Sequence, residues 1–328
     1  MSKNIVIEAS DLTKFYGETL AIDHINFAVE KGEIWGFLGP NGAGKTTTIR
    51  MLTGLSKPSD GKASVLGFDV NTEIVEAKRY IGVVTELSNL YDELTALDNL
   101  LFMAQLYGVP RSQRRRRAEE LLTAFNLYER KDSPLRTFSR GMKRALTVAA
   151  ALIHSPKILF LDEPTVGLDV VAARSLRNLI GNLRQEGITI FLTTHYLEEA
   201  DFLCERIAIL VKGRIIEIDT PRALKATVEE ESVIEFSFAG EASNLTENLS
   251  DRLPEVTIVL RDHNRLRISG GAPSKVYECV CQVTKARSIE LLSVNSIKPT
   301  LEDAYIKITG LSPTVMVIEK GTRQNVAQ

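Results

Sequence analysis

The amino-acid sequence predicts an α/β fold over residues 1 to about 220, followed by a small α+β domain. Short apolar runs alternate with helical stretches in the first region, a glycine-rich loop separates one such run from a helix, and the composition shifts near Thr220 and Pro221. Alternation of this kind is typical of a parallel sheet covered by helices.

The apolar runs at residues 34–39, 157–162 and 188–195 end in a glycine, a carboxylate and a histidine. We interpret them as buried parallel strands whose carboxyl ends carry functional loops. Residues 206–216 are expected to form two more strands around the turn at Lys212 and Gly213.

A long, mostly helical stretch separates the first two apolar runs. Thr95 occupies an N-cap position with Asp98 three residues later, and apolar residues follow at helical spacing at positions 97, 100, 101, 104 and 107. Phe102 and Met103 lie off this apolar stripe and are candidates for contact with a partner, although core packing is the more frequent outcome for either residue.

The region beyond residue 221 has its own pattern. Residues 232–238 and 265–269 alternate as strands do, and residues 274–286 and 300–310 have helical patterns. We therefore assign residues 1–221 to the first domain, 222–310 to a small α+β domain and 311–328 to a loose tail.

Composition excludes several classes of protein. The 328 residues carry 40 Lys and Arg against 42 Asp and Glu, and this balance gives no electrostatic case for a nucleic-acid partner. The basic residues of 111–117 are followed by two glutamates, which indicates a solvated helix face. Three cysteines in a long chain and no apolar signal segment favour a cytoplasmic location. The longest apolar run, 145–153, is about half of the roughly 20 residues that span a membrane.

A phosphate-binding motif, G-x-x-x-x-G-K-[ST], lies between an apolar run and a helical segment. Its glycines let backbone N–H groups turn around an anion, and the helix start adds positive charge. Lys45 would reach the β- and γ-phosphates, and the Thr46 hydroxyl would ligate Mg²⁺. The loop comprises Gly39, Pro40, Asn41, Gly42, Ala43, Gly44, Lys45, Thr46 and Thr47. These residues predict a site for a nucleoside triphosphate.

Two carboxylates at the end of residues 157–162 complete this site. The apolar strand before Asp162 and Glu163 would bring both to the sheet edge where the phosphates lie. Asp162 can hold the metal through water, and Glu163 is positioned to activate an attacking water. His195 ends the next strand and could contact the γ-phosphate.

The order of these motifs resembles the ATP-binding subunits of ABC transporters. Lys45 and Asp162 are 117 positions apart, far more than one crossover needs, so a helical insertion is expected between them. The resemblance covers residues 4–220 and implies a P-loop (RecA-like) core, an N-terminal antiparallel β subdomain and an inserted helical subdomain at about 87–155. Its motifs occur in family order: Tyr16, the phosphate loop, the loop after residues 80–84, Ser139-Arg140-Gly141-Met142, Asp162-Glu163, Asp169 and His195.

The resemblance implies a role for each matching residue. Tyr16 would stack on the adenine of ATP, Glu163 would be the general base, and His195 would sense the γ-phosphate. The family closes two cassettes head to tail around two nucleotides, so Ser139, Gly141 and Asp169 would contact the ATP of the opposite subunit. From the residues alone, Ser139 is also a good helix N-cap.

Two positions depart from the family pattern. The usual L-S-G-G-Q signature is Phe138-Ser139-Arg140-Gly141-Met142 here, so a charged residue replaces the first glycine. Glu86 stands where the family usually has glutamine. A carboxylate can still ligate Mg²⁺ but adds negative charge beside the γ-phosphate, and we expect Glu86 to remain a metal ligand that alters the coupling of hydrolysis to movement.

The resemblance predicts an ATPase that acts as a homodimer or paired cassette and drives export through separate transmembrane permease subunits. It would be cytoplasmic and peripheral on the inner face of the membrane, with the segment after Glu86 docking the permease. Residues 299–310 resemble an element of accessory C-terminal domains of daunorubicin-resistance type. One alternative is an ABC-type ATPase acting on ribosomes or DNA; a switch GTPase would need an N-K-x-D element, which the sequence lacks.

Overall fold

The computed structural model describes residues 4–86, 89–228 and 233–311. It divides into two compact units, one ending at Thr220 and the other beginning at Pro221, where the composition shifts. The domain limits 1–221 and 222–310 stay predictions, and residues 312–328 of the predicted tail lie outside the described residues.

A six-stranded sheet forms the centre of the first unit, in the order β10-β9-β3-β8-β7-β6. The five strands from β9 to β6 pair in parallel, and β10 is antiparallel to β9. Every residue of β3, β7 and β8 is buried, as expected for strands covered on both faces. The strands are β3 (Ile34–Leu38), β6 (Ile81–Val84), β7 (Ile158–Asp162), β8 (Thr189–Thr194), β9 (Arg206–Val211) and β10 (Arg214–Asp219).

A second, antiparallel sheet of this unit has the order β2-β1-β4-β5. Its strands are β1 (Ile5–Tyr16), β2 (Thr19–Glu30), β4 (Asp60–Val65) and β5 (Phe68–Asp69). Phe27 of β2 stacks against Trp35 and contacts Phe37 and Phe191, so an aromatic cluster joins the two sheets. The hydrophobic core that contains this cluster draws on both sheets and on α1.

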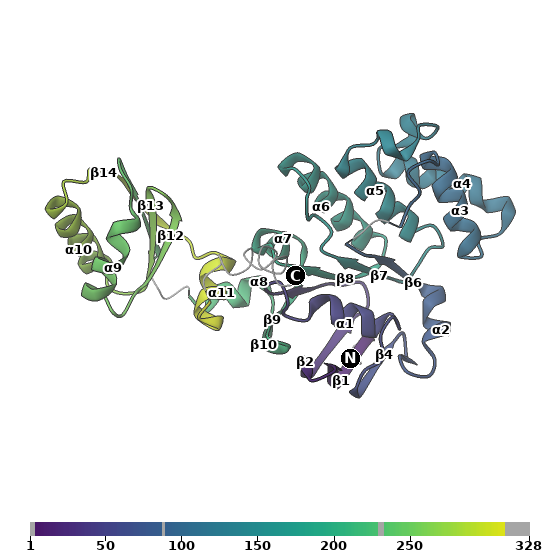
Figure 1. Cartoon of the computed structure of the whole chain (residues 1–328), viewed down its shortest axis with the longest axis horizontal. Helices are drawn as coiled ribbons and strands as arrows, with labels where there is room; N and C mark the ends of the chain where they lie inside the picture. The colour runs from purple at the N-terminus through teal and green to yellow at the C-terminus, as the bar shows by residue number, and fades with distance from the viewer. Residues whose placement is uncertain (1–3, 87–88, 229–232, 312–328) are drawn as a thin grey trace, which may run out of the picture. The chain divides into compact units, whose positions relative to one another are not determined.

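Helices complete the first unit, and Figure 1 shows α3, α4 and α5 grouped on one side of the central sheet, with β1, β2 and β4 on the other. The predicted caps are present: the Thr95 hydroxyl accepts a hydrogen bond from Asp98 N, and Ser139 Oγ accepts one from Met142 N. The helices are α1 (Lys45–Leu52), α2 (Ile74–Ala77), α3 (Ala96–Leu106), α4 (Arg111–Ala124), α5 (Arg140–Ala151), α6 (Val170–Gln185) and α7 (Leu197–Leu203), with 3-10 turns η1 (Lys78–Tyr80), η2 (Tyr128–Arg130) and η3 (Leu135–Thr137).

The second unit contains a four-stranded antiparallel sheet in the order β12-β13-β11-β14. Its chain order, strand-helix-strand-strand-helix-strand, is that of a split βαβ fold. An apolar core lies between this sheet and α9 and α10. The elements are α8 (Pro221–Ala226), β11 (Val233–Phe238), α9 (Ser243–Arg252), β12 (Thr257–Asp262), β13 (Arg265–Ser269), α10 (Pro273–Ala286), β14 (Leu291–Ile297) and α11 (Leu301–Thr309).

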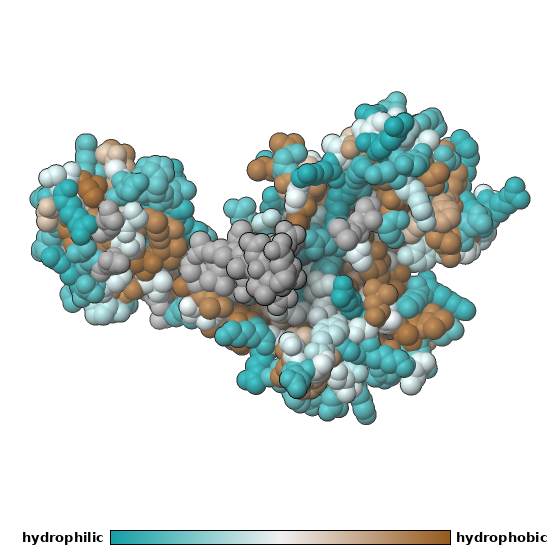
Figure 2. Space-filling view, in the orientation of Figure 1, coloured by the Kyte–Doolittle hydropathy of each residue, from teal (hydrophilic) through white to brown (hydrophobic). Residues whose placement is uncertain are grey.

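The face of the molecule in Figure 2 carries hydrophilic side chains over most of its area, with hydrophobic residues in separate patches. Among the described residues, none of the helices has the length and apolar character needed to cross a bilayer.

Candidate active site

The loop between β3 and α1 is held close to its neighbours by glycines. A Cβ added to Gly39 would lie 2.1 Å from the carbonyl oxygen of Leu210, and one added to Gly44 would lie 2.4 Å from Ile22 Cδ1. Gly44 also has a φ of 109°, a conformation that side chains disfavour. Because α1 begins at Lys45, its first N–H groups lack intrahelical partners and give the helix start a partial positive charge.

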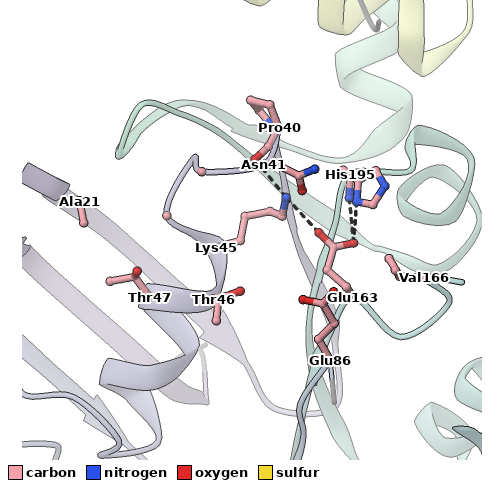
Figure 3. Close-up of a pocket in the computed structure, with 12 residues that line it drawn as sticks. Ala21, Pro40, Asn41, Lys45, Thr46, Thr47, Glu86, Glu163, Val166 and His195 are labelled. Atoms are coloured by element: carbon pink, nitrogen blue, oxygen red, sulfur yellow. Dashed lines mark hydrogen bonds and ion pairs between the residues drawn. The ribbon is translucent and has the colours of Figure 1, made fainter. Parts of the chain in front are cut away.

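A pocket opens beside the start of α1, and Figure 3 shows the side chains that line it. It joins the loop after β3 to the residues that follow β6, β7 and β8. The lining residues are Ala21, Pro40, Asn41, Gly42, Gly44, Lys45, Thr46, Thr47, Glu86, Glu163, Val166 and His195. Of the residues predicted for the phosphate loop, Gly39 and Ala43 belong to its buried backbone rather than to the pocket wall.

Glu163 lies between Lys45 and His195 (Figure 3). Its Oε1 pairs with Lys45 Nζ at 3.0 Å, and its Oε2 lies 2.8 Å from His195 Nδ1. Lys45 Nζ also donates to the carbonyl oxygens of Gly39, at 2.6 Å, and Pro40, at 3.2 Å. Burial alone would raise the pKa of Glu163, but the hydrogen bond from His195 and the charge of Lys45 outweigh it and lower that pKa. The carboxyl group is therefore ionised at neutral pH.

Asp162 lies directly beside this group, at the end of β7. Its Oδ1 accepts hydrogen bonds from Thr46 Oγ1, at 3.2 Å, and from Thr193 Oγ1, at 2.6 Å. Hydroxyl and carboxylate oxygens are the donors that Mg²⁺ prefers, so this pair fits that ion. Among the described residues, no cluster of three or more His, Cys, Asp or Glu could hold a metal by itself, so phosphate oxygens or water would supply the other ligands.

Two helix starts lie together outside the pocket. Ser139 caps α5, and Asp169 caps α6 by accepting a hydrogen bond from Ala172 N at 2.8 Å. A Cβ on Gly141 would lie only 2.7 Å from Ala172 Cβ, so glycine permits the close approach of the two helix starts. Of the other signature residues, Arg140 is exposed and Met142 is half-buried. The side chains of α6 that follow the cap, Val170 and Val171, are exposed and apolar.

Tyr16 is the last residue of β1 and lies outside the pocket wall, with 44% of its surface exposed. Its hydroxyl is near Thr47 of the phosphate loop. Burial, which would raise the pKa of Tyr16, is outweighed by hydrogen bonds with Ser56, Thr47 and Arg50, and the pKa is lowered. Lys14 Nζ lies 5.1 Å from the ring centroid.

The two candidates for partner contact on α3, Phe102 and Met103, differ in exposure. Met103 is 7% exposed and belongs to the buried core, so core packing, the alternative given for it, is the outcome and it is not available as a contact residue. Tyr107, placed on the buried stripe, is partly exposed and stacks on His154 instead. Phe102 is exposed and meets Tyr91 edge-on, with ring centroids 5.3 Å apart. Both rings line an apolar groove with residues 90–94.

The sequence reasoning missed three residues near the site. Ala21 and Val166 line the pocket. Arg144 of α5 is buried behind it and donates to backbone carbonyls at the ends of β6 and β7. The sequence offered only a weak signal for Arg144, which lies directly before the apolar run at residues 145–153.

Comparison with known proteins gives consistent similarities. A protein-family model described as "ABC transporter" matches residues 22–166. The linearmycin resistance ATP-binding protein LnrL of Bacillus subtilis is 36% identical over 307 residues, which cover 93% of this chain and 98% of that protein. The daunorubicin/doxorubicin resistance ATP-binding protein DrrA of Streptomyces peucetius is 42% identical over 222 residues, which cover 68% of this chain and 67% of the relative.

Solved structures agree with these matches. An ATP-binding subunit of an ABC transporter superposes with a TM-score of 0.61 at 32% identity, covering 68% of this chain and 92% of the other. A dimeric, post-hydrolysis ATP-binding cassette bound to ADP and Pi superposes with a TM-score of 0.60 at 28% identity, covering 65% and 98%. These relatives lend no support to the alternative of an ATPase acting on ribosomes or DNA.

Proposed function

Because the chain belongs to the ABC transporter family, as one of its ATP-binding and ATP-hydrolysing proteins, we propose that it powers export through separate transmembrane subunits as one of two paired cassettes. The observation that carries the proposal is the meeting of Lys45, Glu163 and His195 beside the start of α1. Phosphoryl transfer to water requires a cation and a general base beside a phosphate-binding loop. Lys45 supplies the cation, Glu163 the general base and His195 a second base.

Each residue of the pocket has a proposed role. Residues 39–47 bind the phosphates of ATP, with Lys45 turning from Glu163 to the β- and γ-phosphates. Glu163, kept ionised by its neighbours, then accepts a proton from the attacking water. His195 stays within reach of both Glu163 and the γ-phosphate. Tyr16 offers an exposed ring beside Thr47 on which adenine can stack.

Charge balance supports a requirement for Mg²⁺. The pocket holds Glu86 and Glu163, with Asp162 immediately behind them, against the single ammonium group of Lys45. A triphosphate adds about four negative charges, and like charges at such short range repel strongly in a partly buried site. We propose that Thr46 and Glu86 hold the ion directly and Asp162 through water. The ion supplies neutralisation of the phosphate charge.

The signature residues support the pairing of two cassettes. Ser139, Gly141 and Asp169 lie at two adjacent helix starts, outside the pocket of their own chain. Helix starts attract anions, so these residues suit the phosphates of a second chain's ATP. The partner is a second copy or a related cassette, and Arg140 and Met142 would lie at the same interface.

The proposal of export rests on relatives named for resistance to linearmycin and to daunorubicin/doxorubicin. The apolar groove formed by residues 90–94 and Phe102 is the proposed dock for the transmembrane partner, since Tyr91 and Phe102 are exposed and the groove begins four positions after Glu86 in the sequence. This partner would hold the chain at the cytoplasmic face of the cell membrane.

Glu163→Gln tests the proposed chemistry. Loss of a general base removes about 10²- to 10⁴-fold in rate, so kcat for ATP hydrolysis should fall by that factor while ATP still binds. The control is Glu33→Gln, which removes a glutamate of the same unit that is equally buried, at 8% exposure, but pairs with Arg206 at the start of β3, the opposite end of that strand from the pocket. Normal hydrolysis by Glu163→Gln would contradict the assignment.

A further inference from the structure

Arg144 of α5 joins three segments of the first unit through its guanidinium group. Nε donates to the carbonyl oxygen of Pro164 at 2.8 Å, and Nη2 donates to those of Asp162, at 2.8 Å, and Glu163, at 3.0 Å. Nη1 donates to the carbonyl oxygens of Thr85, at 2.5 Å, and Glu86, at 3.4 Å. A guanidinium has five N–H groups, so these five contacts use all of them.

Three of these contacts surround a residue with an unfavourable backbone conformation. Glu163 has a φ of 49°, in the left-handed region that costs free energy for any residue with a Cβ. Such a conformation persists only where the surroundings impose it. Arg144 bonds the carbonyls of Asp162, Glu163 and Pro164, and therefore fixes the turn that aims the Glu163 side chain at Lys45 and His195.

Arg144 is a buried cation. It is 8% exposed, and burial lowers its pKa while the carboxylates of Asp162, Glu199, Glu86 and Glu163 act in the opposite sense. A guanidinium remains protonated under such conditions, so the cation persists. Lysine could not replace it, since an ammonium has three donors on a single atom and cannot reach carbonyls of two strand ends at once.

We infer that Arg144 is a positioning residue that holds Glu163 in its working geometry and couples it to α5, the helix that begins beside Ser139. The inference rests on the proposed function, because it takes Glu163 as the base. A shift of α5 would move the carbonyls of Glu163 and Glu86 together, so contact of Ser139 with a second nucleotide would be felt at both carboxylates.

The test uses the full chain with Arg144→Lys and Arg144→Met. Misplacement of a reacting group by about 1 Å costs about 10²-fold, so we expect kcat for ATP hydrolysis to fall by about that factor in both variants. Binding of a fluorescent ATP analogue should stay within about 3-fold of wild type, because the five hydrogen bonds of Arg144 go to the last residue of β7 and the segments after β6 and β7 rather than to the phosphate loop. The matched control is Arg206→Lys, since Arg206 also donates to a backbone carbonyl, that of Ala28, and pairs with Glu33. This control should retain its kcat at a comparable loss of thermal stability.

A double variant separates positioning from general damage. In a Glu163→Gln background, Arg144→Lys should lower the single-turnover rate by far less than it does in the wild-type background, because Glu163, the base that it positions, is already gone. Three outcomes would overturn the inference. They are a wild-type kcat in Arg144→Lys, an equal loss of nucleotide affinity and kcat in that variant, and a multiplicative loss of rate in the double variant. If Arg144→Met does not fold, Arg144→Lys decides alone. A wild-type chain that hydrolyses no ATP would overturn the proposed function itself, and the inference with it.

Discussion

Gly141→Ala tests whether the starts of α5 and α6 must touch. The added Cβ would lie 2.7 Å from Ala172 Cβ. Carbon atoms in contact prefer a separation of about 3.5–4.0 Å, so the two helix starts would have to separate by about 1 Å. Ser139 and Asp169 cap these helices, and the substitution would move them apart.

Two opposing effects determine how much Gly141→Ala changes the free energy of unfolding. Alanine favours a helix over glycine by up to about 1 kcal/mol, and less at this position because Gly141 lies in the first turn. Overpacking a tight contact costs about 1–3 kcal/mol, and the contact here is between two short side chains that cannot rotate away. The steric term is larger, and we expect a net loss of about 1–2 kcal/mol in the free energy of unfolding. For a unit of this size, each kcal/mol lowers Tm by about 2–4 °C.

Urea unfolding followed by circular dichroism measures this loss, and a double-mutant cycle identifies its cause. Ala172→Gly removes the opposing methyl group, so in the double variant the clash is absent and the two substitutions should show a favourable coupling of about 1–2 kcal/mol. ATP-dependent pairing, measured by sedimentation in a Glu163→Gln background, should weaken in Gly141→Ala and recover in the double variant. Gly141→Ala as stable as wild type, or strictly additive effects in the cycle, would refute the reasoning.

Three further substitutions have defined outcomes. Glu86→Gln removes a carboxylate from the pocket wall, so the Mg²⁺ dependence of ATP hydrolysis should change; an unaltered Mg²⁺ titration and turnover would rule out Glu86 as a metal ligand. Burial raises the pKa of Glu199, so its contribution to stability is complete below its ordinary pKa of 4.5 and is lost as pH rises through the raised value. Glu199→Gln should therefore gain stability over wild type as the pH rises above 4.5 in urea titrations, and an equal difference at all pH values would contradict this. Phe191→Ala removes a ring that contacts Phe27, Phe37 and Phe160, and should cost about 3–5 kcal/mol in the same assay, a loss under 1 kcal/mol being inconsistent with the packing.

The sequence carried much of the fold because its signals are local. The three apolar runs at residues 34–39, 157–162 and 188–195 form strands within one residue of the predicted limits, and the caps at Thr95 and Ser139 are where their side chains placed them. Neighbouring positions likewise determine where the glycines of the phosphate loop lie and which residue follows a buried strand. The meeting of Lys45 with Glu163 also depended on sheet order, which the motif implies but periodicity does not.

Other features could not be predicted because they depend on contacts distant in sequence. Met103 lies off the apolar stripe of α3, yet it is buried in a region where α3 packs against both α4 and α5. Arg144 resembles any charged residue of a helix until the ends of β6 and β7 are placed around it. The position of Tyr16 outside the pocket wall follows from the hairpin of β1 and β2, whose turn no motif specified.

The chemistry of the site depends on strand register in the central sheet. Asp162 of β7 pairs with Thr193 of β8, and Leu38 of β3 pairs with Thr194. Neighbouring strands lie about 4.8 Å apart, so the residues that follow these pairs, Gly39, Glu163 and His195, emerge together at one edge. If β7 slipped by one residue, the side chains of Asp162 and Glu163 would each move to the other face of the sheet. Phe160 and Phe191 are directly paired and fully buried, so their packing opposes such a slip. The packing of Phe160 therefore determines that Glu163, three residues later in the chain, is the carboxylate that reaches Lys45.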